Sequence, residues 1–143
     1  MYLCAGGENL LFTQDIILDQ QARLLNPLQL AYVGDTVWEM LVRTRLIHKG
    51  LNVHGMHRAA IAQVNAGAQA AALDRVMDKL NQEEETLVRR GRNAHSHHSA
   101  PRNQTPADYG NATGLETLLG YLYLTGQFDR LQELFRFTQD EGV

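Results

Sequence analysis

Cysteine is nearly absent from this chain of 143 residues, and Cys4 is the only one. A single cysteine excludes a disulfide framework and a cysteine-based zinc site, which favours a reducing, intracellular setting. The sequence also has no apolar run of membrane-spanning length, and its start, MYLCAGGENLLFTQD, lacks the basic residues and unbroken apolar stretch of a signal peptide. Only 12 glycines and 3 prolines are present, too few for a fibrous protein or a linker. We therefore expect a cytoplasmic protein without a membrane anchor.

The length and composition are those of one globular domain. Hydrophobic residues make up 44% of the chain and charged residues 20%, enough apolar surface to bury a core without disulfides or a structural metal. No internal repeat is visible. We expect a single domain over 1–143, in which residues 1–13 form an N-terminal extension without a recognisable pattern.

Charge is unevenly distributed along the chain. The net charge of −3 argues against a nucleic-acid-binding protein, but no acidic residue occurs between Glu85 and Asp108. That stretch carries four arginines and three histidines: Arg89, Arg90, Arg92, Arg102, His95, His97 and His98. An acidic protein can therefore still present a basic face.

Apolar residues recur at helical spacing in most of the chain. Asn26-Pro27 is a favoured helix start, and the helix that follows should end near Gly50. An alanine-rich segment over 55–80 predicts further helix, with Gly67 as a candidate break, and Asn81 should begin another helix that Gly91 ends. Tyr109 to Leu124 and the segment after Gly126 also have helical patterns. No segment alternates as a half-buried strand would, so the sequence predicts an all-α protein of six or seven helices.

The segment over 91–108 has two prolines and no apolar periodicity, and it predicts a long loop. Loops of this length in compact domains are uncommon and tend to be functional or mobile.

Two carboxylates occupy unusual positions beside apolar helical faces. Asp35 follows Gly34 and lies one turn after Ala31, while Glu116 lies one turn after Ala112 and one turn before Gly120. Small neighbours allow two helices to approach closely, so the two carboxylates could meet at a crossing. Facing carboxylates repel unless a cation lies between them, and Mg²⁺ would supply that charge. Alternatively, Asp35 caps a restarted helix or pairs with an arginine, and the two acids are unrelated.

Several motifs resemble the ribonuclease III family. Leu30-Ala31-Tyr32-Val33-Gly34-Asp35 and the segment from Gly114 to Leu124 are similar to the two halves of its catalytic signature. The short bacterial Mini-III branch is the nearest likeness, because RRGRN at 89–93, Val64-Asn65-Ala66 and Gln69-Ala70 are also present. The resemblance covers about Leu24 to Phe135, in the right order.

The resemblance implies a helical endoribonuclease that forms a homodimer and cuts both strands of double-stranded RNA with Mg²⁺, for which Mn²⁺ could substitute, giving 5′-phosphate products. Asp35 and Glu116 match the catalytic acids that bind the metal. Full-sized ribonuclease III has further acids where this chain has Leu28, Ala31 and Thr113, which leaves the number of metals open. Because Val143 leaves no room for a separate RNA-binding domain, we expect the catalytic domain itself to hold the RNA. For Mini-III the implied substrate is the precursor of large-subunit (23S) ribosomal RNA.

RNA contact is expected from the basic stretch, through Arg89, Arg90, Arg92, Asn93 and Arg102, because guanidinium groups match phosphate geometry. His95, His97 and His98 form a weak candidate for metal binding, since no fourth ligand accompanies them. The competing hypothesis is a non-catalytic RNA-binding or ribosome-associated module on the same fold. Metal-dependent cleavage would separate the two.

Overall fold

The structure is a computed structural model that describes residues 4–9, 15–94 and 104–139. Within these residues a two-stranded antiparallel hairpin, β1 (Cys4–Asn9) and β2 (Asp15–Ile17), precedes the helices. The α-helices are α1 (Asp19–Arg23), α2 (Pro27–Ile47), α3 (Val53–Gln63), α4 (Ala66–Val76), α5 (Gln82–Ala94), α6 (Pro106–Leu124) and α7 (Phe128–Thr138), with a 3-10 turn η1 at Met77–Lys79. The predicted all-α class is confirmed, with the hairpin as an addition.

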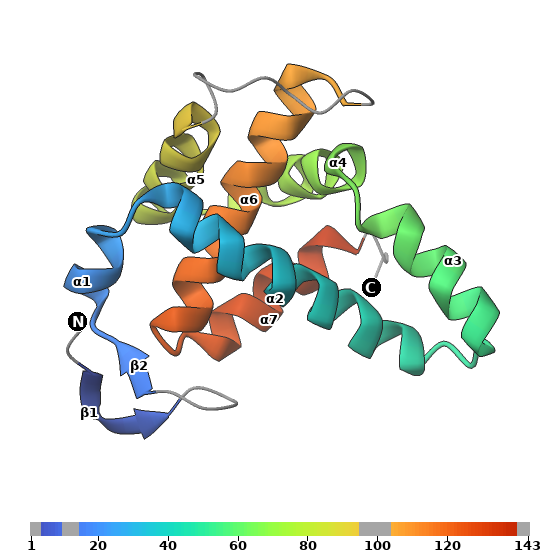
Figure 1. The fold of residues 1–143 in the computed structure, drawn as a ribbon, viewed down its shortest axis with the longest axis horizontal. Coiled ribbons are helices and arrows are strands. Elements are labelled where there is room, and N and C mark those ends of the chain that lie inside the picture. Colours follow the sequence, from blue (N-terminus) through green and yellow to red (C-terminus); the bar gives the residue numbers. More distant parts are fainter. Residues whose placement is uncertain (1–3, 10–14, 95–103, 140–143) are drawn as a thin grey trace.

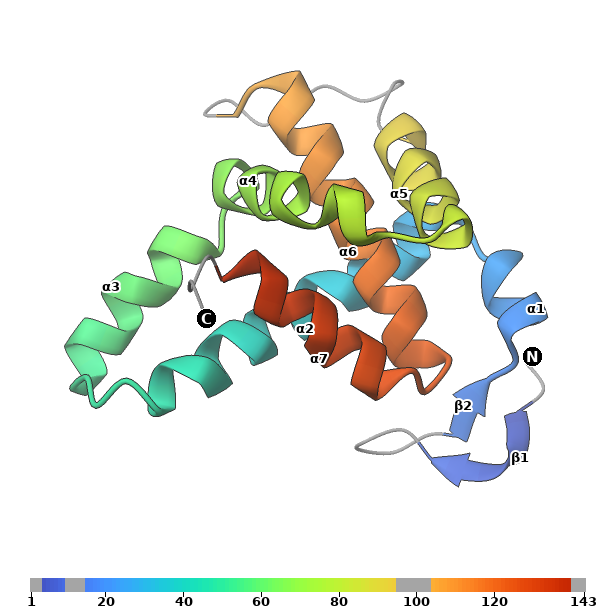
Figure 2. The ribbon, with the colours of Figure 1, turned by 180° about the vertical axis from the view of Figure 1, so that it is seen from behind.

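Helix α6 runs through the centre of the molecule. In Figure 1, α2 crosses in front of it and α5 lies alongside, and Figure 2 shows α4 and α7 on the opposite side. Eleven of its residues are buried, including Leu115, Leu118, Leu119 and Leu122. A side chain of α6 that points between the surrounding helices therefore packs against several of them at once.

The closest helix packing occurs where α2 crosses α6. A Cβ atom built on Gly34 would lie 1.7 Å from the main-chain oxygen of Glu116, and one built on Gly120 would lie 1.9 Å from that of Leu30. Only glycine fits at either position, because the other helix's backbone occupies the space of a side chain. The predicted close crossing at small residues is confirmed.

Polar side chains fix where the helices of this crossing begin. Asn26 caps α2 in a reciprocal capping box with Gln29, and Pro27 occupies the first turn. Thr105 caps α6 through the Asp108 amide, again with a proline, Pro106, in the first turn. These local signals fix where α2 and α6 begin and therefore on which side of each helix Asp35 and Glu116 lie.

The N-terminal hairpin differs from the sequence prediction. The sequence predicts no pattern over residues 1–13, yet β1 lies within them. Its segment, CAGGEN, contains two glycines and no alternation of apolar and polar residues, so periodicity cannot reveal it. Ile16 of β2 is buried and packs on Gly126, at the turn between α6 and α7.

Two glycines have roles other than the predicted ones. Gly91 does not end its helix, because α5 continues to Ala94, and a Cβ there would lie 2.2 Å from Oγ1 of Thr117 on α6. Gly67 lies in the first turn of α4, and the break falls instead at Val64-Asn65. The segment over 91–108, predicted as a loop, is helical at both ends, because α5 continues to Ala94 and α6 begins at Pro106, and residues 95–103 lie outside the described residues.

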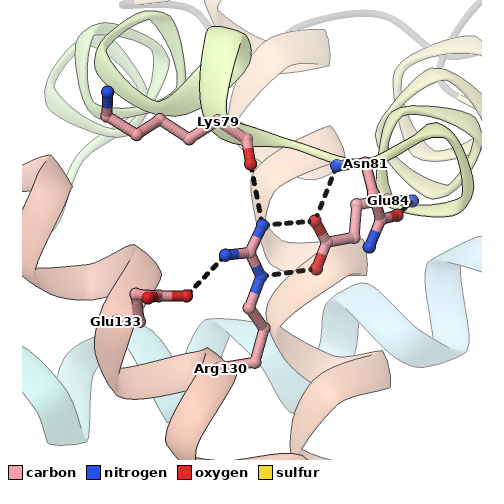
Figure 3. A network of polar contacts seen from close by, with 5 residues as sticks. All are labelled: Lys79, Asn81, Glu84, Arg130 and Glu133. Atoms are coloured by element: carbon pink, nitrogen blue, oxygen red, sulfur yellow. Dashed lines mark hydrogen bonds and ion pairs between the residues drawn. The ribbon is translucent and has the colours of Figure 1, made fainter.

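A network around Arg130 joins α7 to the start of α5 (Figure 3). Arg130 donates from Nε to Oε2 of Glu84 at 2.9 Å and from Nη2 to Oε1 at 2.7 Å, and it also reaches the Lys79 carbonyl and Glu133. Burial alone would raise the pKa of the Glu84 carboxyl, but the hydrogen bonds from Arg130 and the Asn81 amide outweigh it, and the pKa lies below its usual value. Glu84 is therefore the ionised partner through which α5 is held to α7.

Candidate active site

Asp35 and Glu116 lie together at the crossing of α2 and α6. They line one side of a pocket of about 440 Å³, together with residues of α4 and the turn before it. The side chain of Asp35 is exposed and that of Glu116 is partly buried. Asp35 does not cap a restarted helix, because α2 runs without interruption through this position, and the two acids are not unrelated, because the Asp35 carboxylate interacts with that of Glu116.

The site makes Glu116 an unusual acid. Its pKa is raised from 4.5 to about 8, first because burial disfavours the charged form and then because Asp35 hydrogen-bonds and repels it. A hydrogen bond from Gln69 acts in the opposite direction. At neutral pH the Glu116 carboxyl therefore keeps its proton when no cation is bound.

The two carboxylates could hold a hard divalent cation. Within the part of the chain that the structure describes, no cluster of three or more His, Cys, Asp or Glu side chains could bind a metal. Carboxylate oxygens are ligands typical of Mg²⁺ sites, and the amide side chains of Asn65 and Gln69 line the same pocket without adding charge. Leu28, Ala31 and Thr113, where the sequence resemblance led us to expect further acids in a full-sized enzyme, line the same pocket.

A larger groove, of about 1270 Å³, lies between the C-terminal half of α2 and α7. Its charged residues have mixed signs, with the carboxylates of Asp129 and Glu133 among the cations Arg45, Lys49, Arg130 and Arg136. Chemistry rather than size therefore singles out the pocket at Asp35 and Glu116.

The residues predicted to contact RNA lie in two parts of the chain. Arg89, Arg92 and Asn93 are exposed on α5. Arg92 donates from Nε to Oδ1 of Asn111 on α6 at 2.7 Å. Arg102 and the histidines at 95, 97 and 98 lie outside the described residues.

Arg90 has a structural role that the sequence does not reveal. Its Nη1 donates to the carbonyl of Arg23 at 2.9 Å and its Nη2 to that of Leu25 at 3.1 Å. These bonds tie α5 to the connection between α1 and α2. The expected RNA contact of Arg90 stays a prediction.

Gln69 is the functional candidate that sequence reasoning misses. It is only 5% exposed, and its Nε2 donates to Oε2 of Glu116 at 3.3 Å. The sequence does contain a signal, because Gln69 belongs to the segment that resembles the Mini-III branch. Nothing in its spacing indicates a partner 47 residues away.

Comparisons with known proteins place the chain in a family. The Ribonuclease III domain matches residues 28–127. The Mini-ribonuclease 3 of Symbiobacterium thermophilum is 48% identical over 117 residues, covering 81% of this chain and 89% of the relative, and that of Brevibacillus brevis is 45% identical over 118 residues, covering 82% and 87%. A crystal structure of a Fusobacterium nucleatum protein superposes with a TM-score of 0.73 at 26% identity, covering 82% of this chain and 93% of the other.

These matches agree with the helical fold. In the described residues, no helix has the length and apolar character needed to cross a membrane. The chain belongs to the ribonuclease III family, in its Mini-ribonuclease 3 branch, and is an endoribonuclease.

Proposed function

We propose that this protein is a Mg²⁺-dependent endoribonuclease that hydrolyses double-stranded RNA, with Asp35 and Glu116 as its catalytic metal ligands. The observation that carries the proposal is the meeting of these two acids in one pocket, with the pKa of Glu116 raised to about 8. Such perturbed acids in a cleft are typical of catalytic sites. Mn²⁺ has the same preference for oxygen ligands and should substitute.

The two carboxylates would act as metal ligands. Asp35 and Glu116 would hold the cation through their carboxylate oxygens once Glu116 has lost its proton, and α2 and α6 fix the separation of the two side chains. Bound Mg²⁺ supplies activation of water and polarisation of the scissile phosphate. No side chain is assigned as general base, and the products should carry 5′-phosphate ends.

Arg89, Arg92 and Asn93 would bind the duplex from the exposed side of α5, with Arg102 and Arg90 as further candidates. An A-form duplex is recognised mainly through phosphates and 2′-hydroxyls, which guanidinium and amide groups match. Because these contacts release counterions, affinity should fall as salt increases.

A second copy of the chain is the proposed partner. One pocket can cut one strand, so cutting both strands of a duplex requires two sites. Beside the pocket, Tyr32 is 83% exposed and Met40 is 48% exposed, and both line an apolar hollow of about 310 Å³ between α2 and α6. Exposed apolar patches of this kind mark interaction surfaces. Sedimentation should show a dimer that Tyr32→Glu dissociates; a monomeric parent would contradict this assembly.

The likeness to the Mini-III branch extends the proposal to the physiological substrate, the precursor of large-subunit (23S) ribosomal RNA, and to a cytoplasmic location. The alternative, a non-catalytic RNA-binding or ribosome-associated module, keeps the fold and the basic helix but holds no metal.

Incubation of the purified protein with a long RNA duplex and with one of its single strands tests the proposal. We expect cleavage of the duplex in Mg²⁺ or Mn²⁺, no cleavage in EDTA, and little cleavage of the single strand. Salt-sensitive duplex binding without cleavage in either metal would overturn the proposal in favour of the non-catalytic module.

A further inference from the structure

The turn between α3 and α4 is fixed from several directions. Asn65 caps α4 by accepting from the Ala68 amide at 2.9 Å, and its Nδ2 donates to the carbonyls of Ile61 at 3.1 Å and Ala62 at 3.2 Å at the end of α3. Trp38, on α2 one turn after Asp35, donates from Nε1 to the carbonyl of Gln63 at 2.9 Å. One amide side chain and one indole therefore tie the start of α4 to α3 and to α2.

This anchored turn determines where Gln69 lies. Gln69 is one turn after Asn65, and its main-chain N–H donates to the main-chain carbonyl of Asn65 at 3.0 Å. The neighbouring alanines, Ala66 and Ala70, are 4% and 5% exposed, so this face of α4 is packed against the body of the protein. Gln69 reaches the Glu116 carboxylate from this packed face, as a buried amide from a third helix.

An amide donor suits Glu116 in its metal-binding state. An ionised carboxylate only accepts hydrogen bonds, and a glutamine amide can donate to it without adding charge. A carboxylate that binds metal usually has such an outer hydrogen bond, which fixes its orientation and increases its affinity. A lysine or arginine here would itself neutralise the site and compete with a cation.

We propose that Gln69 is the positioning residue of the active site: its Nε2 holds Oε2 of Glu116 so that the carboxylate stays turned toward Asp35 and the two can share one cation. This inference rests on the proposed function. The segment from Val64 to Ala70 thus positions the Glu116 carboxylate. Asn65, with Trp38 of α2, fixes the start of α4, and Gln69 makes the contact.

Mn²⁺ binding to the protein without RNA tests this role directly, because it does not require cleavage. Gln69→Met keeps the length of the side chain and removes the donor, and Gln69→Asn keeps an amide that is one methylene too short. Gln82→Met, at an exposed position in the first turn of α5, is the matched control. Circular dichroism and thermal unfolding establish that each variant is folded.

We expect both Gln69 variants to bind Mn²⁺ about tenfold or more weakly, with duplex affinity unchanged, and to require correspondingly more Mg²⁺ for cleavage while saturating metal restores most of the rate. Gln82→Met should match the parent. A folded Gln69→Met or Gln69→Asn that binds Mn²⁺ as tightly as the parent would overturn the inference. Failure of the parent itself to bind Mn²⁺ would instead overturn the proposed metal site.

Discussion

The raised pKa of Glu116 predicts that the metal-free protein becomes less stable as pH rises. The folded protein keeps the Glu116 proton up to about pH 8, whereas the unfolded chain loses it near 4.5. Between these values the folded state binds more protons than the unfolded state, so the free energy of unfolding falls with increasing pH. The contribution of Glu116 is complete below about pH 4.5 and is lost as pH passes through 8.

The size of this effect follows from the interval between the two pKa values. At ~1.4 kcal/mol per pH unit, the change from 4.5 to about 8 has an upper limit of ~5 kcal/mol. The pocket opens to solvent, which screens part of the charge, so we expect about 2–3 kcal/mol between pH 5 and 9.

Urea unfolding followed by circular dichroism in EDTA, at pH 5 and pH 9, measures the effect. Glu116→Gln is the matched variant, because it has nearly the same shape and does not titrate. Other groups also titrate in this range, so the relevant quantity is the difference between parent and variant in their pH-dependent loss of stability. Adding Mg²⁺ at pH 9 should stabilise the parent and not the variant. Equal losses in parent and Glu116→Gln would show that the folded protein does not hold the Glu116 proton up to about pH 8.

Three further predictions follow from the packing and the surface. Gly34→Ala places a methyl group 1.7 Å from the backbone of Glu116 and should cost about 3 kcal/mol or more in unfolding experiments, whereas Gly67→Ala meets only ordinary contacts and should be tolerated. Arg130→Met leaves Glu84 buried without its ion-pair partner and should lower the free energy of unfolding in urea by about 3–5 kcal/mol. The double variant Arg130→Met/Glu84→Gln should lose less than Arg130→Met alone, and an equal loss in the two would contradict an ionic role for the pair. Arg89→Ala and Arg92→Ala, in a Glu116→Gln background, should each reduce the salt dependence of duplex binding by about one counterion, while Arg43→Ala, at a residue paired with Glu39, should leave it unchanged.

Local signals and small residues make the central part of the site predictable. Asn26-Pro27 sets the start of α2, and the helical period then places Asp35 at the margin of the core. Gly34 and Gly120 indicate a close helix crossing from their positions in the sequence alone, and α2 and α6 do cross at those two residues. Both carboxylates and their meeting can therefore be predicted from the sequence.

Other features depend on contacts between distant parts of the chain. Gly91 resembles a helix terminator, but its small size accommodates Thr117 on another helix. Arg90 resembles an RNA-binding residue, yet in the structure it donates to two backbone carbonyls more than 60 residues away. Gln69 and the Glu84–Arg130 pair also have partners on other helices, and no spacing rule within one helix can identify them. Tertiary packing determines these roles.

Cleavage of a long RNA duplex in Mg²⁺ by the parent, Asp35→Asn and Glu116→Gln most directly tests the two-carboxylate site. We expect the parent to cut the duplex and each substitution to abolish cleavage while folding and duplex binding remain. Undiminished cleavage by either folded variant would contradict the assignment of that carboxylate to the metal site.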